Sequence, residues 1–123
     1  MRRSISSFIL VLTISSMGYA QENEKLFAMI YSKGKGWNEN IATSEQAYFK
    51  AHSLHLQNLR KQGKILVGGR YADLGFMILK AEDAKEAESI TKQDSSVVSG
   101  TFKVELFEFH TFYTGCVGST KQD

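Results

Sequence analysis

The segment from Ser44 to Gln62 constrains the fold of this chain most, because it carries the strongest helical period in the sequence. The run Thr43-Ser44-Glu45-Gln46 matches a capping box, in which a hydroxyl and a Glu or Gln side chain satisfy free backbone groups at a helix start. Gly63 is typical of the residue that follows the last turn of a helix. The central stripe of the predicted apolar face consists of Tyr48, Ala51, His55 and Leu59. The residues on either side of this stripe are Ala47, His52 and Leu56. The sequence therefore predicts an amphipathic helix that packs on another layer of structure.

Short apolar runs on both sides of this helix have the composition of β-strands. One run precedes the helix, two follow it, and a longer one lies near the end of the chain: Lys25–Tyr31, Lys64–Tyr71, Phe76–Ala81 and Thr101–Tyr113. The connection Ala72-Asp73-Leu74-Gly75 is short enough to join the second and third runs as a hairpin.

A second, more polar helix is expected over Glu82–Gln93, and loops are expected over Ser32–Ala42 and Asp94–Gly100. The predicted order is strand, helix, strand, strand, helix, strand. This order is typical of an α+β domain with the ferredoxin-like βαββαβ plan, in which an antiparallel sheet carries both helices on one face. A length of 123 residues with 42% hydrophobic content fits a single domain.

The predicted last strand carries Phe107, Phe109 and Phe112, which we expect to supply much of the core. If Phe107 and Phe109 point away from the helices, the sheet face opposite the helices is apolar. In a domain this small, a second copy is the simplest cover for such a face. The sequence therefore predicts a homodimer that forms through the open sheet face.

Residues 1–20 have the pattern of a secretory signal peptide. Arg2 and Arg3 give a positive start, Phe8–Ile14 is a short apolar run, and Gly18-Tyr19-Ala20 offers a cleavage site between small residues. We expect export by the general secretory route, to the periplasm or out of the cell.

The mature domain is then expected to cover residues 21–123, without a membrane segment, because no other run approaches the roughly 20 apolar residues of a membrane span. Loss of Arg2 and Arg3 with the signal leaves 13 basic and 13 acidic residues. A neutral chain without a basic block argues against nucleic-acid binding. Cys116 is the only cysteine, so it has no partner for an internal disulfide and is either a free thiol or an intermolecular link.

Motifs along the mature chain resemble those of the YCII-related (YciI-like) family in the dimeric α+β barrel superfamily. That family has a helix reading His-Leu-x-x-Leu, a Gly-Arg/Lys-Leu-Leu turn, a Gly-Pro pair and, later, Asp-Pro-x-Val-x-x-Gly. The matching segments here are His52-Ser53-Leu54-His55-Leu56, Gly63-Lys64-Ile65-Leu66, Gly68-Gly69 and Asp94-Ser95-Ser96-Val97-Val98-Ser99-Gly100. Gly69 and Ser95 stand where the family usually has prolines.

The resemblance implies a histidine and aspartate pair beside a pocket, which carries over here to His52 and Asp94. A carboxylate that accepts one ring N–H of a histidine fixes its tautomer and leaves the other nitrogen free to take a proton. The alternatives are a His52 ring bonded to a backbone carbonyl and an Asp94 that only caps the turn after the second helix.

The sequence offers other polar and aromatic residues for the candidate site. Periodicity places His55 at the centre of the apolar stripe as a packing residue, and His110 is expected to pack across strands. No pair among the histidines has the short spacing of a zinc site, so no metal is expected. We expect no cofactor either, since Gly34-Lys35-Gly36 lacks a nucleotide fingerprint. Candidate substrate-binding residues, each of which has a structural role as its alternative, are Arg70, Tyr71, Trp37 and Tyr48.

Together these features predict an acid/base enzyme of the lyase or isomerase type, which acts on a small organic molecule without a cofactor. The family resemblance carries this prediction, because the few family members with an assigned reaction include a dehydrochlorinase. The alternative is a non-catalytic dimer of the same fold that binds a small ligand or has a structural role.

Overall fold

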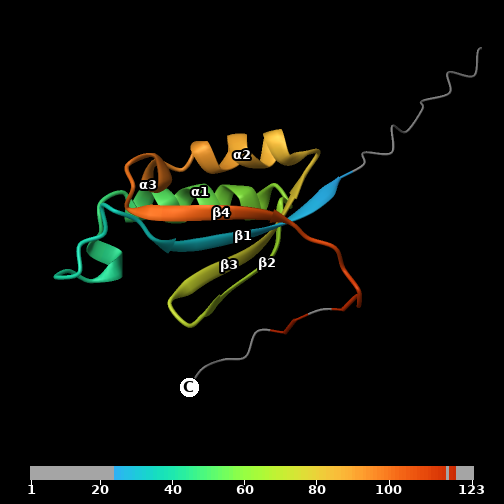
Figure 1. The fold of residues 1–123 in the computed structure, drawn as a ribbon, viewed down its shortest axis with the longest axis horizontal. Helices are drawn as coiled ribbons and strands as arrows, with labels where there is room; N and C mark the ends of the chain where they lie inside the picture. Colours follow the sequence, from blue (N-terminus) through green and yellow to red (C-terminus); the bar gives the residue numbers. More distant parts are fainter. Residues whose placement is uncertain (1–23, 116, 119–123) are drawn as a thin grey trace, which may run out of the picture.

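The computed structural model describes residues 24–115 and 117–118, so the predicted signal peptide and Cys116 lie outside the described residues. One antiparallel sheet has the strand order β2-β3-β1-β4, with β1 at Lys25–Lys33, β2 at Ile65–Tyr71, β3 at Leu74–Ala81 and β4 at Phe102–Glu108. Figure 1 shows the helices on one face of the sheet, and they are α1 at Phe49–Lys61, α2 at Ala84–Lys92 and α3 at Ser95–Val98. The predicted α+β class and ferredoxin-like plan are therefore confirmed. None of the helices in the described part of the chain is long and apolar enough to cross a membrane.

The core fills the space between this sheet and the helices. Phe27, Met29 and Tyr31 alternate along β1, and all three side chains are buried on the same face of the sheet. Leu59 of α1 and Ile90 of α2 pack against them from the helical layer. The last residue of this β1 series, Tyr31, lies near the end of its strand, where the site described below is built.

The start of α1 differs from the prediction. Residues Thr43–Glu45 form a separate 3-10 turn, and α1 begins only at Phe49, after Tyr48 has adopted a left-handed backbone with φ 62°. The buried Gln46 side chain explains the break, because its amide accepts a hydrogen bond from Asn38 N–H at 2.9 Å and donates to Asn38 O at 2.6 Å. The predicted helix over Ser44–Gln62 is therefore wrong at its first turn, where a long-range side-chain contact replaces helical bonding.

The end of α1 agrees with the prediction at Gly63. Gly63 has a left-handed backbone with φ 72°, and its N–H donates to Arg60 O at 2.9 Å. Lys64 N–H donates to Leu59 O at 2.9 Å, which completes a Schellman motif. This motif turns the chain directly into β2.

Glycines clamp the loop after β1 to the segment that precedes β4. Gly34 N–H donates to Thr101 O at 2.9 Å, and Gly36 N–H donates to Gly100 O at 2.8 Å. A Cβ atom at Gly34 would overlap the carbonyl oxygen of Gly100, so only glycine fits there without a backbone shift. The clamp holds the loop that carries Trp37 next to the turn that follows α3.

The last strand is shorter than predicted, and Phe107, Phe109 and Phe112 do not supply the core of the described chain. β4 ends at Glu108, Phe107 is 54% exposed and Phe112 is 93% exposed. Alternation along the strand explains this, because Leu106 packs on the core while Phe107 points to the sheet face opposite the helices. The described segment after β4 turns back toward that face, because Phe109, Thr111 and Tyr113 line a cavity together with Phe76 and Ile78 (Figure 1).

Candidate active site

His52 lies on the face of α1 that is turned toward the sheet. It is 8% exposed, and its ring centroid lies 4.9 Å from that of Tyr31 and 4.7 Å from that of Phe102. Leu59 is buried as predicted, but the rest of the predicted stripe is rotated from the buried face: Tyr48 and Ala51 are exposed, whereas His52, predicted on a shoulder, is buried. His52 is therefore at the centre of the buried face, where periodicity had placed His55.

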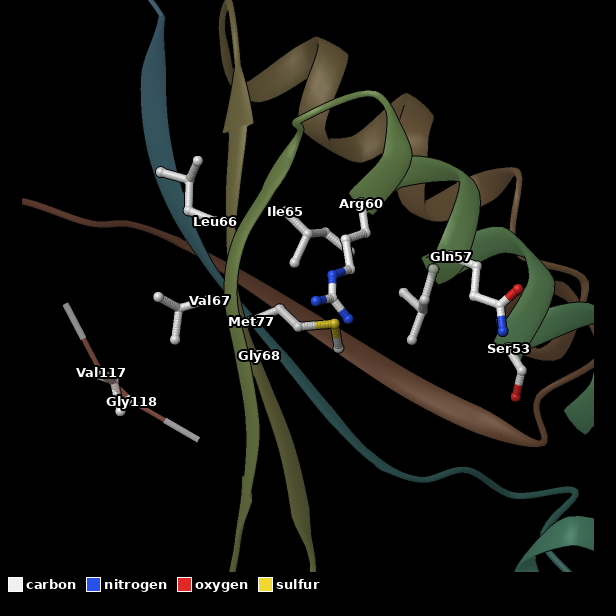
Figure 2. Close-up of a pocket in the computed structure, with 11 residues that line it drawn as sticks. Ser53, Gln57, Arg60, Ile65, Leu66, Val67, Gly68, Met77, Val117 and Gly118 are labelled. Carbon is white, nitrogen blue, oxygen red and sulfur yellow. The ribbon is translucent and has the colours of Figure 1, made fainter. Parts of the chain in front are cut away.

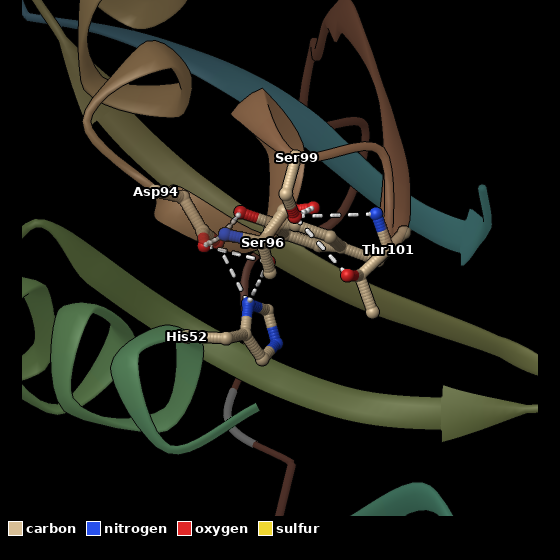
Figure 3. Close-up of polar contacts among 6 residues, drawn as sticks. His52, Asp94, Ser96, Ser99 and Thr101 are labelled. Carbon is tan, nitrogen blue, oxygen red and sulfur yellow. Dashed lines mark hydrogen bonds and ion pairs between the residues drawn. The ribbon is translucent and has the colours of Figure 1, made fainter. Parts of the chain in front are cut away.

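Asp94 is completely buried at the start of α3 and accepts four hydrogen bonds (Figure 3). Its Oδ1 atom accepts from the Ser96 N–H at 3.0 Å and from the Ser96 hydroxyl at 2.6 Å. Its Oδ2 atom lies 2.7 Å from His52 Nδ1 and accepts from the Tyr31 hydroxyl at 3.2 Å. The carboxylate thus caps α3 with one oxygen and holds His52 with the other, so it fills both roles that the sequence had left open.

The surroundings of Asp94 keep it ionised. Burial by itself raises the pKa of this carboxyl group, but the hydrogen bonds from His52 and Ser96 and the charge of His52 outweigh burial. The pKa therefore falls from 3.8 to about 2. A carboxylate in this state has no proton to donate, so the proton in the contact with His52 belongs to Nδ1.

This assignment leaves the other ring nitrogen of His52 available for chemistry. With a proton on Nδ1, the neutral ring has an unprotonated Nε2. Figure 3 shows the second ring nitrogen pointing away from Asp94. His52 also lines a cavity of about 370 Å³, whereas Asp94 does not line it. The pair therefore presents one basic atom to the cavity and keeps the carboxylate behind it.

Tyr31 and Ser96 complete the site and were not singled out from the sequence. Burial raises the pKa of the Tyr31 phenol, and the charge of Asp94 raises it further, so Tyr31 stays a hydrogen-bond donor. The completely buried Ser96 holds Asp94 through both its hydroxyl and its backbone N–H. The sequence contains a local pattern for each residue. Alternation along β1 places Tyr31 on the core face, and a serine two residues after an aspartate is typical of a capped turn.

The cavity beside His52 brings together two of the other predicted residues. Trp37 comes from the loop after β1 and Arg70 comes from β2, and both line the cavity. The Trp37 ring centroid lies 5.5 Å from that of Phe102, which in turn contacts the His52 ring. Residues far apart in the sequence therefore meet around one small space.

Tyr48 and Tyr71 do not line this cavity. Tyr48 is 56% exposed, because its left-handed backbone turns the chain just before α1. Neighbouring residues of a strand point to opposite faces, so Tyr71 cannot share the side of β2 from which Arg70 reaches the cavity. Tyr71 instead makes an edge contact with Phe76, with 6.3 Å between the ring centroids.

The remaining histidines lie outside the site. His55 is half-buried between α1 and α2, and its Nε2 atom has no hydrogen-bond partner among the described residues. His110 is exposed and follows the end of β4, so the predicted cross-strand packing is wrong because the strand stops at Glu108. In the described part of the chain, no group of three His, Cys, Asp or Glu side chains is placed to hold a metal ion.

A second hollow, of about 620 Å³, lies between α1 and β2 (Figure 2). Its lining includes Leu56, Arg60, Ile65 and Val117. Among the described residues that line it, Arg60 is the only ionisable one, so these residues include no group able to accept a proton. Acid/base chemistry therefore points to the cavity beside His52.

Comparison with known proteins agrees with the fold. A family model described as YCII-related domain matches residues 26–110, which include β1 through β4 and both members of the His52–Asp94 pair. Neither the curated proteins nor the solved structures gave a match. Because the matched residues make up well over half of the chain, the protein belongs to the family with the YCII-related domain.

Proposed function

We propose that the protein, after export, is a cofactor-independent acid/base enzyme of the lyase or isomerase type that acts on a small organic molecule. The observation that carries this proposal is the 2.7 Å contact between His52 Nδ1 and a buried, ionised Asp94. A buried carboxylate is unfavourable unless it is paired and hydrogen-bonded. Four hydrogen bonds meet that requirement here, and one of them orients an imidazole that borders a cavity.

In the proposed reaction, His52 Nε2 takes a proton from a carbon or oxygen of the substrate. The positive ring that results is stabilised by the Asp94 carboxylate, which keeps its own charge throughout. In an isomerase the ring returns the same proton to another atom of the substrate. In a lyase the electron pair left on the substrate forms a new double bond as a leaving group departs, and the proton passes to that group or to water.

The tautomer of His52 tests the pair. In the wild-type protein, ring ¹⁵N shifts should report a proton on Nδ1 and none on Nε2 at a pH where the ring is neutral. In Asp94→Asn the acceptor charge is lost, so we expect the proton to redistribute between the two nitrogens and both shifts to move. Two-dimensional ¹H–¹⁵N NMR of the ring measures this directly.

His55 provides an internal control, because it lies one turn further along α1 and makes no contact with Asp94. Its ring shifts should not change in Asp94→Asn. If the His52 shifts also stay unchanged, the orienting role of Asp94 is excluded, and a ligand-binding or structural role of the domain is the better explanation.

A homodimer through the open sheet face is part of this proposal. It is supported by apolar side chains that remain exposed on or beside the sheet, which include Leu66, Val67 and Phe107. Patches of this kind mark surfaces that associate. The partner proposed here is a second copy of the chain.

Sedimentation velocity at micromolar concentration should therefore show a dimer for the wild-type protein. Phe107→Asp should shift it to a monomer, because a charge on the buried face of an interface is strongly unfavourable. Leu54→Asp is the control, since Leu54 is 56% exposed and lies on α1, on the opposite side of the sheet from the proposed interface. A monomeric wild type, or dissociation by both variants alike, would contradict the proposal.

A further inference from the structure

Among the described residues that line the cavity beside His52, Arg70 is the cation that has no carboxylate partner. It pairs with Gly75 across the β2–β3 hairpin, and its side chain lines the same cavity as His52. Within residues 24–115 and 117–118, no ion pair or side-chain hydrogen bond involves its guanidinium group. An arginine beside a cavity with its donors free is suited to bind a carboxylate, because the planar fork matches two oxygens at once.

The other charges that line the cavity differ from Arg70. Lys33 donates to Glu39 at 2.8 and 3.0 Å, and its ammonium lies 5.3 Å from the centre of the Trp37 ring. Its charge is therefore already paired with a carboxylate. Asp73 in the hairpin turn carries the only negative charge among the described residues that line the cavity. An incoming anion should be attracted by Arg70 and repelled by Asp73.

The walls of the cavity favour a flat, apolar body on the ligand. Trp37, Phe49 and Phe102 line it, and the ring of His52 lies 6.3 Å from Phe49 and 4.7 Å from Phe102. A volume of about 370 Å³ is close to the lower end of the roughly 300–1,000 Å³ typical of ligand pockets. The space therefore suits a molecule built on a single ring.

We propose that the substrate class of this site is a small aromatic or cyclic carboxylate, whose anionic group binds Arg70 while its ring packs on the aromatic wall next to His52. The inference rests on the proposed function, since it names the molecule on which the His52–Asp94 pair would act. It places the charge of the substrate next to β2 and its reacting atoms next to α1. Arg70 then acts as the residue that selects anions.

Trp37 makes this inference measurable without knowledge of the reaction. It is the only tryptophan in the chain and lines the cavity, so its fluorescence reports on bound ligands. Benzoate should bind about tenfold more tightly than its neutral analogue benzamide, because a charge-assisted hydrogen bond to arginine adds to the contact of the ring. The preference should fall as the ionic strength rises, since Arg70 is exposed.

Three variants separate Arg70 from general effects of charge. Arg70→Gln should abolish the preference for benzoate over benzamide. Arg60→Gln removes the same charge from the hollow of Figure 2, outside this cavity, and should leave the preference intact. Asp73→Asn removes the opposing charge and should strengthen benzoate binding.

Equal binding of benzoate and benzamide, no saturable binding of benzoate, or a preference that survives Arg70→Gln would each overturn the inference. These outcomes are distinct from failure of the proposed function. Arg70-dependent binding of benzoate combined with an unchanged His52 tautomer in Asp94→Asn would keep the anion site and exclude the acid/base pair. The reverse combination would keep the pair and exclude only the assigned substrate class.

Discussion

Replacement of Asp94 by alanine is expected to lower the free energy of unfolding by about 3–5 kcal/mol, because it leaves buried donors without an acceptor. The donors are the Tyr31 hydroxyl, His52 Nδ1–H, the Ser96 hydroxyl and the Ser96 N–H. Urea denaturation followed by circular dichroism measures the change. Few point substitutions exceed this size in a small domain.

The effect should depend on pH in a defined direction. The pKa of Asp94 is lowered from 3.8 to about 2 in the folded protein, so the ionised group stabilises the fold. This contribution, about 2 kcal/mol, is complete above roughly pH 4 and is lost as the pH falls toward 2. The difference in stability between the wild type and Asp94→Asn should therefore shrink over that window.

Asp83→Ala is the matched control, since Asp83 also caps a helix with its carboxylate but is exposed. Its side chain accepts from Glu86 N–H at 2.8 Å at the start of α2. Loss of a helix cap costs about 1 kcal/mol. A cost for Asp94→Ala no larger than that for Asp83→Ala would mean that Asp94 acts as a cap alone.

Gly34→Ala should destabilise the protein by about 3 kcal/mol, because the new Cβ meets backbone atoms that cannot rotate away. Besides the overlap with the Gly100 oxygen, the Cβ would lie 2.8 Å from the Gly100 carbonyl carbon and 3.0 Å from the Phe102 carbonyl carbon. Relief of these contacts requires the clamp between the loop after β1 and the segment before β4 to open. Thermal unfolding measures the loss, and the Trp37 fluorescence should change with it.

Gly69→Ala is the control for this substitution. No atom lies within 4 Å of a Cβ placed at Gly69, and the residue does not have a positive φ. A change of less than about 1 kcal/mol is expected there. Equally small effects of the two substitutions would contradict the close approach of Gly34 to the Gly100 carbonyl group.

The sequence predicted the layers of the fold well because the alternation of apolar residues and the glycines that end helices and strands are local signals. The hairpin of β2 and β3 and the end of α1 at Gly63 both follow from such signals, although the turn is shorter than the predicted connection over Ala72–Gly75 because β3 already begins at Leu74. The start of α1 was missed because it depends on Gln46 reaching back to Asn38, a contact that no local pattern records. The four-residue helix α3 was missed because it is too short to show a period.

The site was predicted less completely than the fold. Helical periodicity placed His55 at the centre of the buried face, and only the family resemblance selected His52 together with Asp94. The choice of partner depends on the way α3 docks against α1, which joins residues 42 positions apart in the chain. Local sequence patterns place Ser96 in a turn and Tyr31 on the core face. Only the three-dimensional structure shows that both bind the Asp94 carboxylate.

The two oxygens of Asp94 serve different parts of the molecule, and this division links folding to the proposed activity. One oxygen closes the first turn of α3, while the other fixes the imidazole on α1. A chain whose last third has not yet docked therefore has a histidine but no oriented base. Chains in which α3 has not docked on α1 should therefore lack the proposed acid/base activity.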